Sequence, residues 1–167
     1  MIKAIRSIGL AALIIVATTA GSTITDDKAP PVDATSKFLV GTVKTDVTMP
    51  PEVQYEKLFN EKLTDRLKHK KLLAEPGDPN AMVIDSRITQ YSPGNVGDRF
   101  IPFAGKGEAT VSVTSNFGRG GKSLGSVTVQ NGTGGGMGMY AIGADGGVIE
   151  DAAELLVDDL AKKAKGD

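Results

Sequence analysis

Strict alternation of apolar and polar side chains between residues 108 and 117 is the feature that most limits how this chain can fold. The apolar positions are Ala109, Val111, Val113 and Phe117, and the alternate positions carry Glu, Thr, Ser, Thr and Asn. Because successive side chains of a strand point to opposite faces, one face of this strand must be buried and the other wet. Such a pattern is typical of an antiparallel sheet that is covered on one side.

The residues that follow this strand predict a hairpin. Residues 118–122 read GRGGK and favour a turn, and residues 123–131 then return as a second strand. Val127 and Val129 are predicted to point inward from it. Two earlier runs, 36–47 and 81–91, are rich in β-branched residues and predict further strands.

Apolar residues at helical spacing predict two amphipathic helices. The first begins at the Pro-Pro-Glu sequence of residues 50–52 and ends in the basic run 68–71. Its buried stripe is predicted to be Tyr55, Phe59, Leu63 and Leu67. The second helix covers 148–163, with acidic residues early and lysines late. Its stripe is predicted to be Ile149, Ala152, Ala153, Leu156 and Leu160.

This order of elements predicts one α+β domain over residues 35–165. We expect two layers, in which two helices pack on one face of a mostly antiparallel sheet of about four or five strands. A chain of 167 residues is long enough for such a domain to bury a core.

Composition removes several classes of function. The 19 basic residues nearly balance the 20 acidic ones, so no nucleic-acid-binding surface is expected. The chain has no Cys, which excludes disulfides, thiolate catalysis and Cys-ligated zinc. Its one His, His69, lies in a basic helix end and is expected to be exposed. No catalytic set is evident, and we expect neither an enzyme nor a cofactor.

The acidic residues of the last helix are the remaining candidates for a metal site. Glu150, Asp151, Glu154 and Asp158 could hold a hard cation through their carboxylate oxygens. The interpretation we favour is that they form the solvated face of the helix, so no metal is expected.

The first twenty residues have the layout of a secretory signal peptide. Lys3 and Arg6 precede an apolar run of ten residues, and small residues surround a cut after Ala20. The alternative is an anchor that is retained. Ser22 stands where a lipoprotein signal would carry its lipidated Cys, so lipid cannot be attached there. Residues 21–34 are polar, contain two adjacent prolines and predict a disordered leader.

Glycine is concentrated in the second half of the chain, since residues 94–147 hold 16 of the 21 glycines. The run 132–147 fits no phosphate-binding motif. It is expected to be a flexible loop or an irregular edge strand, or else a segment that packs closely against a partner or a bilayer.

The segment between Gly94 and Gly107 is the candidate binding site. A loop of this length is often functional. It carries Arg99, Phe100 and Phe103, and arginine and aromatic residues are enriched in binding hot spots. The alternative is that both phenylalanines fold onto the core and the arginine pairs with a nearby acid.

The order of these residues resembles a family of small bacterial envelope proteins of unknown function, many of them lipoproteins. The resemblance is carried by a Gly-Asn turn, a following Arg and a Gly-x-Gly-x-Ala sequence that opens a Val-rich strand. In this chain these are Gly94-Asn95, Arg99, Gly105, Gly107 and Ala109, followed by the Gly-rich run and a terminal helix. The resemblance spans roughly residues 36–163. Ser22 departs from it and puts outer-membrane anchoring in doubt.

The resemblance implies an exported, non-enzymatic protein of the periplasm or outer membrane. Its layout is also similar to small domains of envelope assembly lipoproteins, which act by protein contact. We therefore expect a protein that binds an envelope protein or polymer. The alternative is a membrane-associating or self-assembling protein that uses residues 132–147, with peripheral membrane contact or a homo-oligomer as the result.

Overall fold

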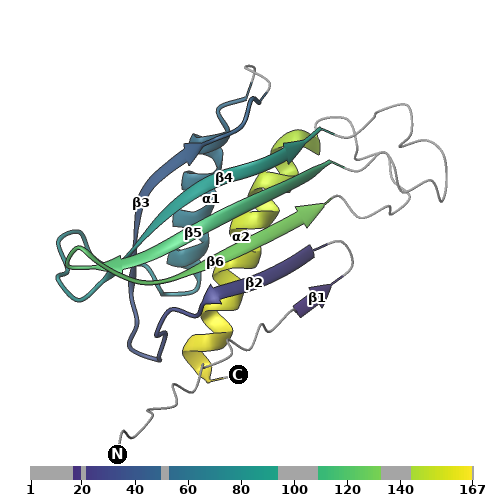
Figure 1. Cartoon of the computed structure of the whole chain (residues 1–167). Coiled ribbons are helices and arrows are strands. Elements are labelled where there is room, and N and C mark those ends of the chain that lie inside the picture. Colours follow the sequence, from purple (N-terminus) through teal and green to yellow (C-terminus); the bar gives the residue numbers. More distant parts are fainter. Residues whose placement is uncertain (1–16, 20–21, 50–52, 94–108, 133–143, 167) are drawn as a thin grey trace, which may run out of the picture.

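The computed structural model of the chain describes residues 17–19, 22–49, 53–93, 109–132 and 144–166. Within these residues the elements follow one another as strand, strand, strand, helix, three strands and helix (Figure 1). They are β1 (Ala17–Thr19), β2 (Ser22–Lys28), β3 (Phe38–Thr45), α1 (Tyr55–His69), β4 (Met82–Ser92), β5 (Thr110–Arg119), β6 (Lys122–Gly132) and α2 (Ala144–Lys165).

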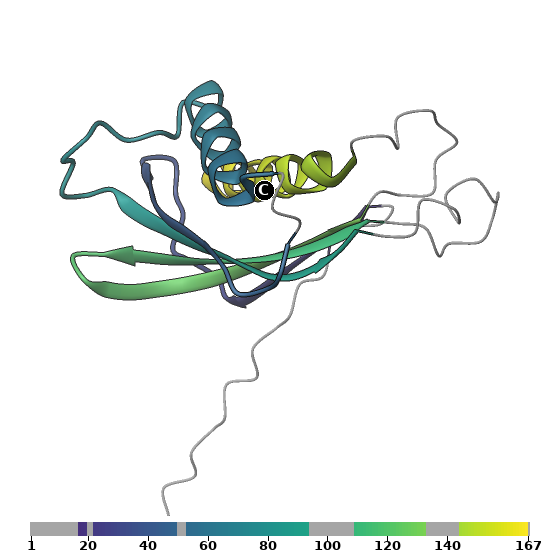
Figure 2. The same cartoon turned by 90° about the horizontal axis from the view of Figure 1, so that it is seen from above.

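The strands form one twisted sheet in the order β1-β2-β6-β5-β4-β3. Neighbouring strands are antiparallel except β3 and β4, which are parallel and are connected through α1. Figure 2 shows that α1 and α2 lie on the same side of this sheet. The predicted two-layer α+β architecture is therefore confirmed. None of the helices in the described residues is long and apolar enough to cross a membrane.

The core lies between the central strands and the helices. Val111, Val113 and Phe117 of β5 are at most 1% exposed, as are Val127 and Val129 of β6. The predicted stripes of α1 and α2 are also buried. The predicted faces of the hairpin and of both helices are thus confirmed, because local periodicity decides which side chains can reach a common core.

At the other side of the sheet, α1 connects the parallel strands β3 and β4. Phe38 at the start of β3 contacts Phe117 edge to face, with ring centroids 6.2 Å apart. The helix ends at His69, which is exposed as expected. Lys71 then adopts a left-handed backbone with φ 59°, and the amide of Leu72 donates to the carbonyl of Leu67 at 2.8 Å. This turn brings the chain back toward the sheet.

The predicted disordered leader is wrong for residues 22–28, which form β2. This strand pairs antiparallel with β6, and Ile24 lies opposite Val129. Ile24 is partly buried and packs against the core. Thr-Ile-Thr at residues 23–25 supplies strand propensity, and pairing with β6 stabilises a segment that its polar composition alone would leave unfolded.

Contacts with distant residues hold β2 in place. The hydroxyl of Ser22 donates to the side-chain oxygen of Asn131 at 2.6 Å, and Lys163 of α2 lies 2.7 Å from Asp26. Lys163 also lies 2.6 Å from Asp159. Where β2 ends, its backbone crosses so close to Gly125 that a Cβ there would meet the carbonyl oxygen of Lys28. Residues 22–28 are therefore an integral strand of the sheet, between β1 and β6.

Ion pairs join α1 to α2 along their outer sides. Lys62 lies 3.0 Å from Glu154 and 3.4 Å from Glu150, and Asp158 lies 3.3 Å from Arg66 and 3.0 Å from Lys70. These acids are half-exposed, and basic residues of α1 neutralise them. In the described part of the chain, no group of three or more His, Cys, Asp or Glu side chains could hold a metal ion.

We expect Val111→Asp to destabilise the domain far more than Thr110→Asp. Val111 is 1% exposed and an unpaired carboxylate there costs several kcal/mol or stays protonated, whereas Thr110 faces the open side of the sheet. Thermal unfolding of the two variants measures the difference. Equal shifts of the midpoint would contradict the assigned faces of β5.

We expect Gly125→Ala to lower the thermal midpoint, because its Cβ would collide with the backbone of Lys28 and push β2 away. Gly147→Ala is the matched control. Its Cβ meets nothing within 4 Å, and alanine favours a helix by about 1 kcal/mol over glycine. Calorimetry should show opposite shifts for the two variants. A neutral Gly125→Ala would contradict the close crossing.

The stability of the domain should depend on the ionisation of Asp158. Burial acts to raise the pKa of this carboxyl, but hydrogen bonds from Lys70 and Arg66 outweigh it and hold the pKa below its ordinary value. A carboxyl with a lowered folded-state pKa stabilises the fold above its unfolded pKa of about 3.9. That stabilisation disappears as the pH falls through the lower, folded-state pKa.

Asp158→Asn should therefore reduce the free energy of unfolding at pH 7 by up to about 1 kcal/mol, since the pair is half-exposed. The difference from wild type should shrink as the pH falls below about 4. Thermal midpoints between pH 2 and pH 7 measure it. A difference that stays constant over this range would show that the ion pairs of Asp158 do not matter.

Candidate functional site

The face of the sheet that the helices leave open is polar. The sheet register places the outward side chains of neighbouring strands in rows. These outward residues include Thr25, Arg87, Thr114, Asn116, Thr128 and Gln130. Neighbours in a row bond to each other, as the hydroxyls of Thr114 and Thr128 do at 3.0 Å. This face therefore presents hydroxyl, amide and charged groups on a rigid surface.

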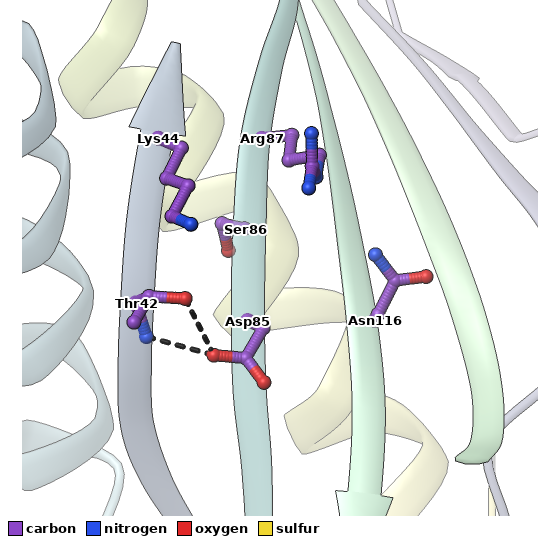
Figure 3. Close-up of a pocket in the computed structure, with 6 residues that line it drawn as sticks. All are labelled: Thr42, Lys44, Asp85, Ser86, Arg87 and Asn116. Carbon is purple, nitrogen blue, oxygen red and sulfur yellow. Dashed lines mark hydrogen bonds between the residues drawn. The ribbon is translucent and has the colours of Figure 1, made fainter.

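A hollow of about 350 Å³ lies on this face where β3, β4 and β5 run side by side. It is lined by Thr42, Lys44, Asp85, Ser86, Arg87 and Asn116 (Figure 3). Figure 3 shows Lys44 and Arg87 toward one end of the hollow and Asp85, Thr42 and Asn116 toward the other. The side chains that face it are two cations, one carboxylate, an amide and the hydroxyl of Thr42.

A bulge in β3 shapes one wall of the hollow. The register of β3 against β4 shifts between Val40 and Val43. Within this bulge, both the amide and the hydroxyl of Thr42 donate to the same oxygen of Asp85, each at 2.8 Å. Gly41 leaves the space that the carboxylate occupies, since a Cβ there would meet Asp85 and lie 2.8 Å from Val83. The geometry of the wall thus depends on glycine at this position.

The two cations of the hollow differ in how they are neutralised. Lys44 lies beside Arg87 in the sheet register, and like charges on neighbouring strands repel each other. Arg87 donates to both oxygens of Asp46, at 3.1 and 3.2 Å. The ammonium group of Lys44 has no hydrogen bond or ion pair within the described residues. An acidic or hydroxyl group of a ligand could therefore be bound by Lys44 without breaking an existing pair.

The side chains that line the hollow are polar or charged. The Ser86 hydroxyl is buried on the helix side and is hydrogen-bonded to Ser115 at 2.8 Å, so it does not face the hollow as a nucleophile. The remaining lining groups donate and accept hydrogen bonds or carry charge. Such a surface offers hydrogen bonds and charge to a polar ligand.

The sequence-predicted site residues Arg99, Phe100 and Phe103 lie outside the described residues, and most of the Gly-rich run does as well. The described residues that flank these segments lie at one end of the sheet. Ser92 is opposite Thr110, and Thr110 is opposite Gly132. The topology thus starts both segments from the same end of the three central strands. The site prediction for Arg99 stays a prediction.

The residues of the hollow were missed at the sequence level. In the predicted strand 81–91, the apolar residues Met82, Ile84 and Ile88 are separated by even numbers of residues along the sequence and so share one face, and all three are buried. Asp85 and Arg87 alternate with them and had to point outward. The local pattern does not predict how β3, β4 and β5 align with one another, and this alignment brings Lys44 and Asn116 to the hollow.

The chain matches no known protein-family model, and no curated protein is detectably similar to it. Its fold is similar to that of solved structures. One is the PelC dodecamer from Paraburkholderia phytofirmans, with a TM-score of 0.52 and 14% identity over 81% of this chain and 96% of that one. Another is an uncharacterised protein, with a TM-score of 0.53 and 10% identity over 80% and 94%.

These two similarities show a shared fold and nothing about function, because the sequence identities are only 14% and 10%. A third similar structure, protein XCC0632 from Xanthomonas campestris, is assigned to the family DUF330. It has a TM-score of 0.46 and 11% identity over 80% of this chain and 85% of that one.

Proposed function

We propose that this protein is an exported, non-catalytic protein of the bacterial cell envelope that assembles with copies of itself and binds a protein or polymer partner. The observation that carries the binding role is the open polar face with its hollow around Lys44 and Arg87. Since α1 and α2 cover the opposite face, the open face is the one that can meet a partner without unfolding the domain.

Export is supported by the sequence of residues 1–20 and by the resemblance to envelope proteins. The basic start, the short apolar run and the small residues near Ala20 fit a cleaved signal. Ser22 cannot carry the lipid that a Cys thiol would accept. The proposal is therefore a protein of the periplasm or the outer-membrane surface that is not lipidated at this position.

Self-assembly is supported by the likeness to PelC. That protein is a dodecamer, and this chain matches 96% of its subunit. Homo-oligomers are common among soluble proteins and are built from repeated copies of one contact. Assembly would also multiply the open faces available to an extended polymer and raise its overall affinity.

Light scattering of the exported protein over a range of concentrations tests the assembly. We expect a mass of several copies at micromolar concentration, together with an intact subunit mass that begins near Gly21. A monomer at every concentration would contradict self-assembly, and a subunit that retains residues 1–20 would contradict signal cleavage.

Crosslinked capture from the native envelope tests the binding face. We expect Lys44→Gln/Arg87→Gln to weaken partner capture several-fold, because it removes both cations of the hollow. Its thermal midpoint should change little, since the exposed pair of Arg87 and Asp46 contributes about 0–1 kcal/mol.

The matched control is Lys68→Gln/Lys162→Gln, which removes the same charge from exposed positions on the helices. Capture should be unchanged in this control. If both double variants lose capture equally, the effect is net charge and the hollow is not the site. If neither loses capture, the partner binds elsewhere, and Arg99→Ala is the next variant to test.

A further inference from the structure

The outer edge of β2 accepts a strand. In the full chain this edge pairs with β1, and Ala17, Thr18 and Thr19 lie opposite Ile24, Thr23 and Ser22. β1 belongs to the segment 1–20 whose sequence predicts a signal peptide. If the signal is cut after Ala20, β1 is lost and β2 becomes the edge of the sheet.

β2 itself should stay in place after the cut. Its pairing with β6, the bond between Ser22 and Asn131 and the pair of Asp26 with Lys163 all lie on its other side or over the core. None of these contacts involves residues 17–19. Removal of the signal would therefore leave a formed strand with its outer backbone groups unpaired, and such an edge readily pairs with another strand.

The two halves of β2 differ in how readily they would pair with another strand. The first half, Ser22 to Thr25, is uncharged and contains the β-branched residues that favour strands. The second half is Asp26-Asp27-Lys28, and charged side chains discourage pairing at an edge. The part of the edge that β1 covers is the uncharged part.

We propose that this edge pairs with β2 of a second copy of the chain, antiparallel about a two-fold axis near Ile24. This inference rests on the self-assembly in the proposed function and names one of its interfaces, because a two-fold contact joins only two copies and a larger assembly needs a second contact. Such pairing sets Thr23 opposite Thr25 of the other copy and Ile24 opposite Ile24, so the same surface fits both copies.

The opposite edge of the sheet is less suited to pairing. Phe38 of β3 already bonds on its outer side, donating to the carbonyl of Leu72 and accepting from the amide of Ala74. The bulge at Gly41 and Thr42 interrupts the rest of β3. The hydrogen bonds of Phe38 and the bulge both hinder the addition of another strand at this edge. The β2 edge is therefore the one we assign to the second copy.

A charge-swap experiment on the exported protein tests this pairing. The variants are Thr23→Lys/Thr25→Lys and Thr23→Glu/Thr25→Glu, on the open face of the strand. In a symmetric pair each variant brings like charges opposite each other, which should weaken self-association about tenfold. Mixing equal amounts of the two variants should restore association. Thr128→Lys/Gln130→Lys, one strand inward on β6, is the control and should associate as wild type does.

Light scattering gives the mass of each sample, and thermal midpoints confirm that each variant is folded. Association that is unaffected by the β2 charges, or that is not restored by mixing, overturns the β2 interface and leaves the self-assembly itself intact. A wild-type protein that is a monomer overturns both. A control that dissociates as strongly as the β2 variants also overturns the assignment to this edge.

Discussion

Burial of one face of the sheet against α1 and α2 is the interaction on which the rest of the molecule depends. The inward valines and phenylalanine of β5 and β6 meet the apolar stripe of α2, and α1 packs against β3. Each fully buried side chain of this kind contributes about 1.5–3 kcal/mol. The exposed ion pairs between the helices contribute about 0–1 kcal/mol each. Apolar burial therefore determines the fold, and the ion pairs adjust it.

This one-sided burial frees the other face of the sheet. Side chains on the open face do not pack in the core, so they are free to be polar or charged. The strands therefore carry polar residues there, namely Lys44, Asp85, Arg87 and Asn116. The bulge at Gly41 uses this freedom to seat the Asp85 carboxylate against the backbone of β3. A binding surface could change on this face without disturbing the core.

The order of the strands has a second consequence. The sheet ends at one side in the protected strand β3 and at the other in the short strand β1, which lies in the predicted signal segment and pairs with β2. Maturation and assembly can then be linked by geometry, because a cut after Ala20 removes the short strand that covers β2. The opposite edge stays closed by Leu72, Ala74 and the bulge.

The parts of the fold that the sequence predicts are those set by local periodicity. The alternation around Val111 and Val113 gave the buried face of β5, and spacing gave the stripes of α1 and α2. β2 was missed because Asp26, Asp27 and the two prolines at 30 and 31 dominated the composition of residues 21–34. The stabilising contacts of β2 come from Asn131 and Lys163, more than a hundred residues away.

The pairing of strands that are distant in the sequence also could not be predicted from local sequence patterns. The local sequence pattern does not predict that β3 and β4 are parallel. The helix between them is long enough for the crossover that parallel strands require. The hollow depends on that pairing, because it sets Lys44 beside Arg87 and Asp85 beside Asn116. The site predicted at Arg99, Phe100 and Phe103 stays a prediction, since these residues lie outside the described part of the chain.

Thiol accessibility tests the central claim, the one-sided sheet, most directly. The chain has no Cys, so a single introduced thiol is the sole reactive sulfhydryl. Ser115 is 1% exposed on the helix side of β5, and its neighbour Asn116 is exposed on the open side. Asn116→Cys should react quickly with a thiol reagent in the folded protein, and Ser115→Cys should react only after denaturation. Equal rates in the folded protein, or a protected thiol at position 116, would contradict the account.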